Sequence, residues 1–455
     1  MIKKFIRRIL GVKKKSSGQI EPVRLGPEEH GIDPQLLSPN AVRVTQTLQE
    51  AGFKAFIVGG AVRDLLLGCK PKDFDIATNA TPEQVKRLFR RAFIIGRRFQ
   101  IVHVILGQEQ LEVTTFRGAS SDGTPKDEHG RVLRDNTFGE QHEDAMRRDF
   151  TINAMYYDAA TQTVLDYHGG ITDIRNKTLR MIGLPEARYR EDPVRLLRVV
   201  RFAAKLGFGI DPDTRAPIKV MAPLIDNVPV ARVFDEMLKL LMSGHALACL
   251  QQLRQEGLHH GLLPLLDVVL EQPQGERFVA LALSNTDKRI QQGKSVSPGF
   301  LFAALLWCQV LEKWTAYKAA GEYPIPALHM AADDVLQAQA EKLALQRKIT
   351  SDMRDVWAMQ PRFERRTGKS PYKLIEHLRW RAGYDFLLLR CAAGEIDQEV
   401  GEWWTAFIEA DGPGREALLA KKPKPEAKGD APKKRSRRRN GHSKQKSAVP
   451  VEGMQ

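Results

Sequence analysis

The 455-residue chain has few cysteines and no long apolar run. Its four cysteines, Cys69, Cys249, Cys308 and Cys391, lie far apart and form no C-x-x-C pair. This spacing argues against a zinc site and a disulfide framework, and it favours a reducing, cytoplasmic compartment. No segment reaches the roughly 18 consecutive apolar residues that a membrane-spanning helix needs. A chain of this length is expected to form two or more domains.

Acidic residues are scarce at the two ends of the chain, where the positive charge is concentrated. Residues 1–15 contain seven Lys or Arg and no acidic residue, and residues 421–446 contain twelve against two acidic residues. Removing these net charges of +7 and +10 from the total of +15 leaves −2 for the rest of the chain. The sequence therefore predicts a nearly neutral globular part with two basic tails.

The first basic segment, residues 1–15, admits two interpretations. Its apolar residues recur at helical spacing between Lys and Arg, so it could form an amphipathic helix on a membrane surface. It could equally be a disordered basic arm. Arg7 and Arg8 interrupt the apolar stretch that a secretory signal requires, which disfavours export.

From about Val42 to Asp158 the pattern is that of an α/β domain. The expected elements are a helix to Ala51, a strand at 55–58, a Gly59-Gly60 turn, a helix containing 64–67, a strand at 73–77 and a helix beginning at Thr81-Pro82. Alternating runs at 100–106 and 110–117 predict an antiparallel hairpin. Residues 118–143 are polar and Gly-rich, and we expect them to be mobile.

Beyond Asp158 the strand signals fade, and helical periodicity dominates from Pro193 to about Ala410. Long helical segments are expected at 236–250 and 332–357. From Pro413 onward almost no large apolar residue remains, so this basic tail cannot bury enough surface to fold alone and is expected to be disordered.

The candidate chemistry begins at Asp73 and Asp75. Residues i and i+2 of a strand project from the same face, so their two carboxylates should converge. Like charges this close raise each other's pKa, and a divalent cation removes that cost. Magnesium is suited to the role because it binds a few carboxylates together with phosphate oxygens. The pair alone is weak evidence, since exposed strand edges also carry acidic residues for solubility.

A double-glycine turn, Gly59-Gly60, lies thirteen residues before the acidic pair. It joins an apolar strand to a helix, an arrangement that lets backbone N–H groups approach a phosphate closely. Arg63 supplies a cation beside it. Most Gly-Gly pairs are only turns, so the proximity of the acidic pair is what gives this one weight.

Four ordered motifs lie between residues 55 and 208. They are Gly59-Gly60-Ala61-Val62-Arg63-Asp64, Asp73-Phe74-Asp75, Arg147-Arg148-Asp149-Phe150-Thr151-Ile152-Asn153-Ala154 and Glu191-Asp192-Pro193-Val194-Arg195-Leu196-Leu197-Arg198. Together they resemble the class II polymerase-beta-type nucleotidyltransferases, which include bacterial poly(A) polymerases and CCA-adding enzymes. The helical remainder is matched only in general character.

The resemblance implies an α/β head with a polymerase-beta-like mixed sheet, followed by a mainly α-helical neck and body. The corresponding division is a basic arm at 1–40, a catalytic head at 41–160, a nucleotide-recognition neck at 161–240, an RNA-binding helical body at 241–412 and a disordered basic tail at 413–455.

The resemblance also implies that Asp73 and Asp75 hold two Mg²⁺ ions, which activate an RNA 3′-hydroxyl and stabilise the departing pyrophosphate. Two residues compete for the place of a third carboxylate. We expect Asp149 to be catalytic and Glu112 to be supporting. Glu112 could also be an ordinary cross-strand partner of Arg117 or of a lysine.

Nucleotide contacts are implied for Gly59, Gly60, Arg63, Arg148, Asn153, Asp192, Arg195 and Arg198. Asp192 and Arg195 lie one turn apart and could offer an acceptor and a forked donor to the edge of a base. Asp192 before Pro193 also has the form of an N-cap, so capping could be its whole role. Arg198 could meet the triphosphate, whereas Arg201 is expected at the surface.

Three features favour poly(A) addition over CCA addition. Residues 95–104, Ile-Gly-Arg-Arg-Phe-Gln-Ile-Val-His-Val, resemble a stretch that marks bacterial poly(A) polymerases, and an N-terminal extension is typical of that branch. The basic tail suits an enzyme that acts on many RNAs, because phosphate neutralisation binds RNA regardless of sequence. We therefore expect transfer of AMP from ATP to RNA 3′ ends, with a role in RNA turnover.

Two alternatives stay open. The chain could be a CCA-adding enzyme, since Asp192 and Arg195 could read either ATP or CTP, or a non-catalytic RNA-binding adaptor on the same scaffold. The expected partners are RNA, bound through the body and the tail, ATP, RNA-decay proteins and a membrane surface contacted by residues 1–15. The tail could instead be a solubility segment or a recruitment site for partners.

Overall fold

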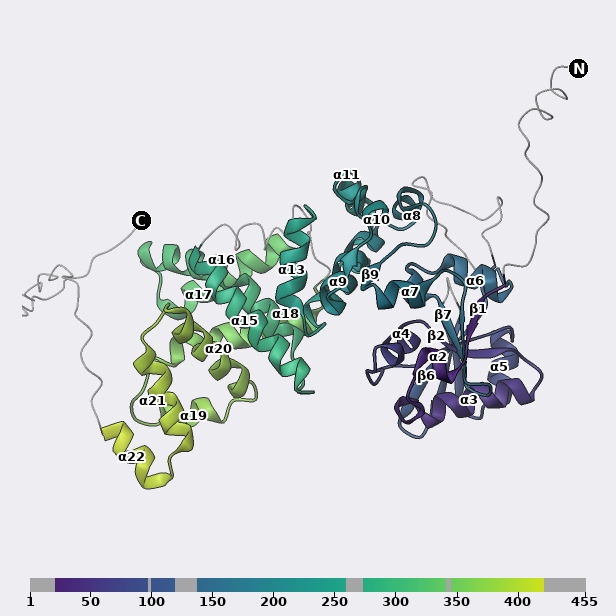
Figure 1. Ribbon diagram of the computed structural model, residues 1–455. Helices are drawn as coiled ribbons and strands as arrows, with labels where there is room; N and C mark the ends of the chain where they lie inside the picture. Colours follow the sequence, from purple (N-terminus) through teal and green to yellow (C-terminus); the bar gives the residue numbers. More distant parts are fainter. Residues whose placement is uncertain (1–20, 97–99, 119–136, 259–272, 341–344, 421–455) are drawn as a thin grey trace, which may run out of the picture.

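The computed structural model describes residues 21–96, 100–118, 137–258, 273–340 and 345–420. The molecule is elongated, with a β-sheet at one end, a helical bundle at the other and a shorter run of helices between them (Figure 1). This arrangement confirms the predicted α/β head followed by a mainly helical neck and body. None of the helices in these ranges is long and apolar enough to cross a membrane.

Several predictions fall outside the described residues. They concern the arm at 1–15, most of the polar loop at 118–143 and the tail from residue 421 onward. They also concern Arg97 and Arg98 of the branch-marking stretch, by which we mean residues 95–104, whose sequence resembles a stretch typical of poly(A) polymerases. The polar loop is described again from residue 137 onward. Phe138 forms an isolated antiparallel β-bridge with Arg117, and a helix begins at Gln141.

The head is built on an eight-stranded sheet in the order β1-β8-β7-β2-β3-β6-β5-β4. Its strands are β1 (Val23–Leu25), β2 (Ala55–Val58), β3 (Asp75–Thr78), β4 (Ala92–Ile95), β5 (Ile101–Leu106), β6 (Glu109–Thr115), β7 (Met155–Asp158) and β8 (Thr163–Asp166). Only β3 and β6 run parallel among these pairs, and the others are antiparallel. The predicted hairpin is confirmed as the antiparallel pair of β5 and β6.

Helices α2 (Pro27–His30), α3 (Pro39–Glu50), α4 (Gly60–Leu66), α5 (Pro82–Leu88), α6 (Gln141–Arg147) and α7 (Gly170–Arg175) accompany the sheet. The predicted start of α5 is confirmed: Thr81 forms a capping box with Gln84, and Pro82 occupies the first helical position. One face of the sheet buries aliphatic residues in the main core, and α3 and α5 contact this part of the head. The other face carries a separate aromatic cluster of Phe56, Phe116 and Tyr156.

The predicted bounds of the head, 41–160, are too narrow. Strand β1 precedes them and strand β8 follows them, and the two pair with each other at one edge of the sheet. The expectation that strands end near Asp158 was therefore wrong. Both strands are short, with four residues or fewer, and hydrogen bonds to distant segments decide their conformation rather than local pattern.

The neck consists of short elements. They are β9 (Thr178–Leu179), α8 (Pro185–Glu191), α9 (Val194–Leu206), β10 (Gly209–Ile210), α10 (Pro212–Arg215), α11 (Ile218–Met221) and α12 (Val230–Leu241). Helix α9 buries one face, which includes Leu196, Val200 and Phe202, so that its arginines are left for the opposite face.

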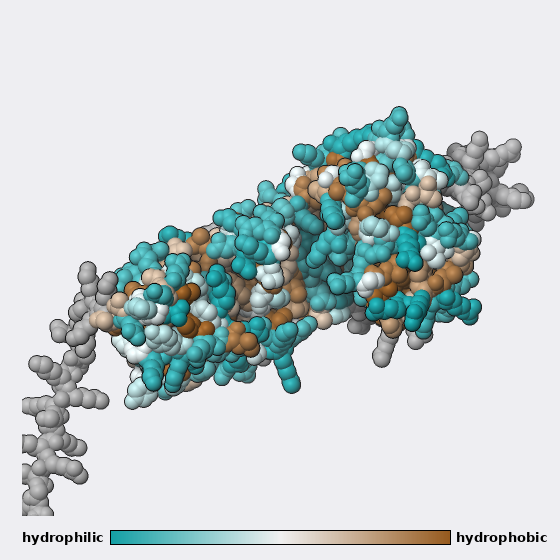
Figure 2. Space-filling model, turned by 90° about the horizontal axis from the view of Figure 1, so that it is seen from below, coloured by the Kyte–Doolittle hydropathy of each residue, from teal (hydrophilic) through white to brown (hydrophobic). Residues whose placement is uncertain are grey.

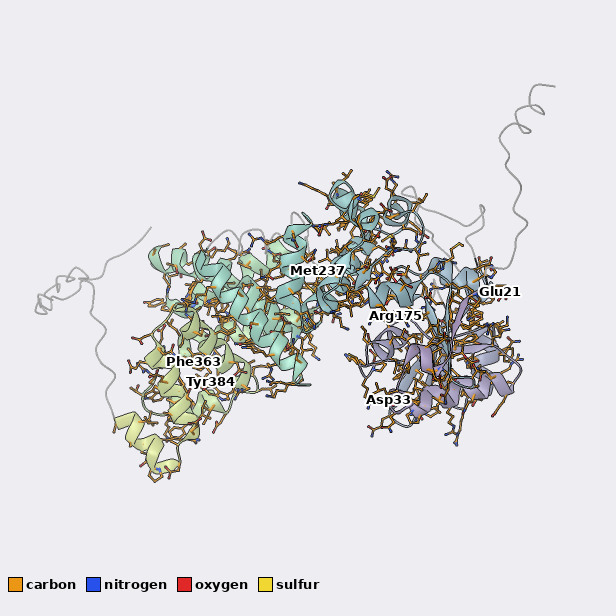
Figure 3. All side chains as sticks on the ribbon, viewed as in Figure 1. Glu21, Asp33, Arg175, Met237, Phe363 and Tyr384 are labelled. Atoms are coloured by element: carbon orange, nitrogen blue, oxygen red, sulfur yellow. The ribbon has the colours of Figure 1, made fainter. Side chains whose placement is uncertain are left out.

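The body contains α13 (Ala246–Gln255), α15 (Pro273–Gln291), α16 (Pro298–Ala319), α17 (Pro324–Ala340) and α18 (Arg347–Met359). Its core is continuous with that of the neck, where Met237 of α12 is fully buried (Figure 3). The two predicted long helical segments are each divided. Gly244, with φ of 78°, separates α12 from α13, and the second segment is split between α17 and α18.

The C-terminal helices α19 (Ser370–Ile375), α20 (Trp380–Ala393), α21 (Gln398–Glu409) and α22 (Gly412–Ala420) form a second, aromatic core that includes Phe363 and Tyr384 (Figure 3). The prediction of disorder from Pro413 is wrong for residues 413–420, which form α22. Leu418 and Leu419 pack against the aromatic core, and this tertiary contact stabilises a segment whose composition alone indicated none.

Candidate active site

A cavity of about 680 Å³ lies where the sheet meets the neck. Hydrophilic residues gather in the middle of the molecule, between the sheet and the helical body (Figure 2). The cavity is lined by all but one of the predicted site residues: Gly59, Gly60, Arg63, Asp73, Asp75, Arg148, Asp149, Asn153, Asp192, Arg195 and Arg198. The remaining one, Glu112, lies on β6 beside Asp75. Residues separated by up to 139 positions are thus brought together, from Gly59 to Arg198.

We call Asp73, Asp75 and Glu112 the floor of the site. Strand β3 begins at Asp75 rather than at Asp73, which lies in a bend just before it. The two carboxylates nevertheless share one side of the chain, because Phe74 between them is buried and both aspartates are exposed to the cavity. Within the described residues neither aspartate side chain makes a hydrogen bond or an ion pair.

Asp75 and Glu112 occupy paired positions of β3 and β6, which places their side chains on the same face. Asp75 reaches the cavity, but the protein around it partly removes it from water; this desolvation, followed by the negative charge of Glu112, raises the pKa of Asp75 to about 6, while Asp73 adds to the rise and Arg148 opposes it. The carboxylates of the floor therefore repel one another, and a cation placed there would relieve this repulsion.

Gly59 makes the turn from β2 into α4. Its φ of 71° and ψ of −130° lie in a region open only to glycine, and a Cβ would stand 3.3 Å from Arg148 Nη1. Gly60 has no such φ, and a Cβ there would meet only Arg63 at ordinary contact distance. The first glycine is thus required by backbone conformation, and the turn brings main chain directly to the cavity lining.

Arg63 is buried at the edge of the cavity. Its guanidinium donates to Asp64 Oδ1 from Nε (2.8 Å) and Nη2 (2.6 Å), and to Asn153 Oδ1 from Nη1 (2.7 Å). It also lies 5.3 Å from the centre of the Phe202 ring. These contacts hold the cation in one position and connect α4 of the head with α9 of the neck.

Arg148 is a second fixed cation. It donates to Asp144 Oδ2 (3.1 Å), to the Tyr156 hydroxyl (3.3 Å) and to the carbonyl of Asn153 (3.4 Å). Burial alone would lower its pKa, but Tyr156 and Asp144 reverse this and raise it, so Arg148 stays charged. Its charge acts on Asp75 from a rigid position.

Asp149 is fully engaged by its neighbours. Oδ1 accepts from the Phe150 N–H (2.9 Å) and from Asn153 Nδ2 (3.3 Å), and Oδ2 accepts from Nε (2.8 Å) and Nη2 of Arg198. Burial would raise the pKa of Asp149, but Arg198 and these hydrogen bonds lower it to about 2. Its neighbours in space are thus arginine and asparagine, whereas Asp75 has Glu112 at its side.

The neck forms the opposite side of the cavity. We call Arg63 of α4, the cavity-lining residues of 147–153 and those of the neck from Glu191 to Lys239 the wall. Arg195 Nη1 donates to the carbonyl of Arg188 and to Glu191 Oε2, both at 2.8 Å. Arg188 in turn donates to the carbonyls of Arg147 and Arg148, at 2.7 Å each, which ties α8 to the head.

Asp192 is not an N-cap. Helix α9 begins at Val194 after Pro193, without a side-chain cap, and Asp192 Oδ2 instead accepts from Arg232 Nη2 on α12 at 3.0 Å. Its Oδ1 is buried and has no hydrogen-bond partner among the described residues. The capping interpretation was therefore wrong, and a buried acceptor is left beside Arg195 in the lining.

Seven basic residues of the lining were not predicted as site residues: Lys72, Arg117, Arg147, Arg201, Lys205, Arg232 and Lys239. Arg201 was expected at the surface, but its side chain is only 11% exposed and donates to buried Glu236 at 2.6 Å. The three-residue spacing of Arg195, Arg198 and Arg201 could have identified it. The lining holds eleven Lys or Arg and six Asp or Glu, which suits a polyanionic ligand.

The floor is chemically suited to a magnesium ion. No group of three or more His, Cys, Asp or Glu in the described ranges is arranged as a metal cage. Magnesium does not require one, because it binds through one or two carboxylates plus phosphate oxygens and water. Asp73 and Asp75 supply hard oxygen ligands free of ion pairs, next to a strongly basic surface that could hold the phosphates.

Comparison with known proteins agrees with this geometry. The model of the poly A polymerase head domain matches residues 55–180, that of a probable RNA and SrmB-binding site of polymerase A matches 207–270, and that of the polymerase A arginine-rich C-terminus matches 320–441. Poly(A) polymerase I of Salmonella typhi is 44% identical over 91% of this chain and 92% of its own. Poly(A) polymerase I of Escherichia coli O157:H7 is 45% identical over the same shares.

CCA-adding enzymes are similar over less of their sequence. That of Lactobacillus helveticus is 39% identical over 45% of this chain and 50% of its own. The crystal structure of the Bacillus stearothermophilus CCA-adding enzyme in complex with CTP, 26% identical, covers 86% of this chain and 90% of its own with a TM-score of 0.56. Since the poly(A) polymerases match along nearly the whole length, the chain belongs to the poly(A) polymerase I family of nucleotidyltransferases.

Proposed function

We propose that this protein is a template-independent poly(A) polymerase that transfers AMP from ATP to the 3′-hydroxyl of RNA and releases pyrophosphate. The observation that carries the proposal is the cavity itself, in which two carboxylates without ion-pair partners face a wall of anchored arginines. Similarity to poly(A) polymerases along 91% of the chain favours this over CCA addition.

Asp73 and Asp75 are proposed to hold two Mg²⁺ ions. When bound, the ions would increase the acidity of the RNA 3′-hydroxyl and stabilise charge on the departing pyrophosphate. Glu112 adds negative charge beside Asp75 and strengthens the attraction for cations. Asp149 would act mainly through its neighbours, because both of its oxygens already orient Arg198 and Asn153.

The wall would bind the triphosphate. Arg63, Arg148 and Arg198 are each held by at least one carboxylate, so they are positioned before the nucleotide arrives. Pre-positioned cations cost little reorganisation during the reaction, and in phosphoryl transfer such positioning provides most of the catalysis. The backbone at Gly59 and Gly60 can approach the phosphates closely because neither residue carries a Cβ.

The base would be read by Asp192 and Arg195. Asp192 Oδ1 is a buried acceptor, and Arg195 has donors beyond the one used by Glu191 and Arg188. The Asp192 acceptor fits the amino group of adenine, and the Arg195 donor fits the adjacent ring nitrogen. A base with a keto group and a protonated ring nitrogen at these positions would instead place acceptor against acceptor and donor against donor. Cytosine presents the same pair of groups, so the size of the site must separate ATP from CTP.

The helical body at 241–412 and the tail at 413–455 are proposed to bind RNA. The division into a head, neck and body is retained, with the head extended to include β1 and β8. The basic tail would bind phosphates regardless of sequence, as an enzyme acting on many RNAs requires. We place the protein in the cytoplasm and in mRNA turnover, with RNA-decay proteins as partners and membrane contact through residues 1–15.

The test is extension of a generic RNA and of a tRNA lacking its CCA end, with each NTP offered separately in magnesium. Long tails from ATP alone on the generic RNA are expected, and Asp73→Asn/Asp75→Asn should abolish them. Addition limited to CTP and then ATP on the tRNA would assign the chain to CCA addition. Failure to incorporate any nucleotide would exclude catalysis and favour an RNA-binding adaptor.

A further inference from the structure

Among the described residues, the catalytic face of the sheet carries exposed side chains over β6 and β4, at Glu112, Phe93 and Ile95. Paired residues of adjacent strands share a face, and such pairs connect Asp75 to Glu112, Glu112 to His103 and His103 to Phe93. A single row of side chains therefore runs from the floor of the site across β6 and β5 to the edge strand β4. His103 Nε2 lies 3.4 Å from Glu112 Oε1, so the row is continuous.

A second row lies beside the first. Ile101 pairs with Ile95, two residues along each strand from His103 and Phe93. Phe93 is 55% exposed and Ile95 40%, although both are large apolar residues, and the Glu112 side chain is 47% exposed. In contrast, the same face over β2 and β7 is closed by the aromatic cluster around Tyr156.

The chemistry assigns a direction to this open surface. In phosphoryl transfer the attacking and leaving oxygens lie roughly in line on opposite sides of the phosphorus. The arginines that would hold the triphosphate come from α4, residues 147–153 and α9, whereas β6 flanks β3 on the side away from β2. If the leaving group lies toward β2 and the wall, the attacking 3′-hydroxyl must arrive over β6.

We propose that the last nucleotides of the RNA 3′ end lie across β6, β5 and β4, with a base stacked on Phe93. This inference rests on the proposed function and names the site of its RNA substrate. Three strand spacings, about 14 Å, separate the floor from the sheet edge, which leaves room for more than the terminal nucleotide. Single-stranded RNA is bound without sequence preference by stacking on aromatic rings beside basic groups.

A basic group is present at the required place. Arg91 is exposed, and its carbonyl accepts from the Ile105 N–H at 2.9 Å, so strand pairing extends to it from β4. Alternation along the strand places Arg91 on the same face as Phe93, where it can meet a phosphate. We refer to Arg91, Phe93, Ile95, Ile101 and His103 as the primer surface.

The branch-marking stretch forms part of the primer surface. The stretch at 95–104 contributes Ile95, Ile101 and His103, which are separated from the nucleotide-reading residues of the wall. A sequence feature typical of poly(A) polymerases therefore lies where RNA, rather than ATP, would be bound. This favours RNA as the occupant over a protein partner, because the surface begins at the reacting group.

Phe93→Ala tests the assignment, since an exposed ring can be removed without leaving a buried cavity. With short oligoadenylate primers, the KM for RNA should rise by about 5- to 150-fold, the range expected for one base stacked on an aromatic ring. The KM for ATP and the kcat at saturating RNA should stay unchanged. Phe93→Trp should restore tight binding, and Val23→Ala, at the opposite edge of the same sheet, should behave as the wild type.

Photocrosslinking gives an independent readout. An oligonucleotide with 4-thiouridine at its last three positions, irradiated without ATP, should crosslink within 91–96 or 100–105. Crosslinks confined to other regions, or an unchanged KM for RNA in Phe93→Ala, would overturn the assignment. Loss of concentration-dependent dimers in Phe93→Ala, with RNA kinetics unaltered, would identify the surface as a protein interface. If the wild-type chain crosslinks but extends no RNA, the proposed function fails and the RNA site stands.

Discussion

The floor and the wall of the cavity hold acidic residues in opposite states. On the floor, Asp73 and Asp75 make no hydrogen bond or ion pair within the described residues, and the pKa of Asp75 is raised to about 6 by burial and by Glu112. On the wall, Asp149 and Glu191 are each held by arginine.

The difference separates two uses of the same chemical group. Carboxylates of the wall fix arginines in place, so their removal should damage the structure. On the floor, Asp73 and Asp75 are left without partners at a cost that a bound cation would offset, so removal of either carboxylate should damage function only.

Asp75→Asn should reduce RNA extension by about a thousandfold or more, because a charged group at the reacting centre is lost. In the absence of divalent metal the variant should be at least as stable as the wild type, because an unfavourably placed charge has been removed. Extension assays and thermal melting check the two parts. A large fall in melting temperature would contradict the view that the floor is functional rather than structural.

Asp149→Asn should instead reduce stability, by about 1–3 kcal/mol, because Arg198, whose side chain is 31% exposed, would keep only Glu236, at 3.9 Å, as a negative partner. Activity should fall as well, since the orientation of Arg198 and Asn153 depends on Asp149. Denaturant titration measures the first effect. If the variant kept full stability but lost extension completely, Asp149 would have the same role as Asp73 and Asp75 and would act directly in the reaction.

Gly59→Ala should cost about 1–3 kcal/mol of stability, since alanine would be forced into a strained backbone conformation at φ of 71°. The shift should also displace Arg148 Nη1, 3.3 Å from the new Cβ, and weaken ATP binding. Gly60→Ala is the matched control for stability, because Gly60 has no positive φ and alanine would not be strained there. Equal effects in both variants would show that bulk in the turn, rather than backbone conformation, is what matters.

The smallest effect concerns pH. The folded-state pKa of Asp75, about 6, lies above its ordinary value of 3.8, so the stability gained by protonating Asp75 is complete below about pH 4 and is lost as pH rises through 6. Mg²⁺ must displace that proton, so its affinity should be about tenfold weaker at pH 5 than at pH 7. Calorimetric titration without RNA measures this difference, and Asp75→Asn should remove it.

Local sequence determined much of the site. The turn at Gly59 and the spacing of Asp73 and Asp75 act over a few residues, so their geometry follows from backbone rules. Resemblance in four motifs then pointed to Asp149, Asp192, Arg195 and Arg198 as candidate site residues, but not to Arg201. All of these line one cavity.

Tertiary structure decided the contacts between distant segments. Arg232 binds Asp192 across forty residues, and Glu236 binds Arg201 across thirty-five, and neither pairing leaves a local pattern. The same holds for Glu112, whose position beside Asp75 depends on a parallel pairing of β3 with β6.

The short elements that the sequence did not predict also depended on tertiary contacts. Strands β1 and β8 and helix α22 have weak local signals and form because a partner surface covers them. The chemical nature of the reacting groups could be predicted from the chain alone, because geometry over a few residues places them. The fold alone decided which charges are paired and which are left for substrates, because pairing depends on distances that only a folded chain defines.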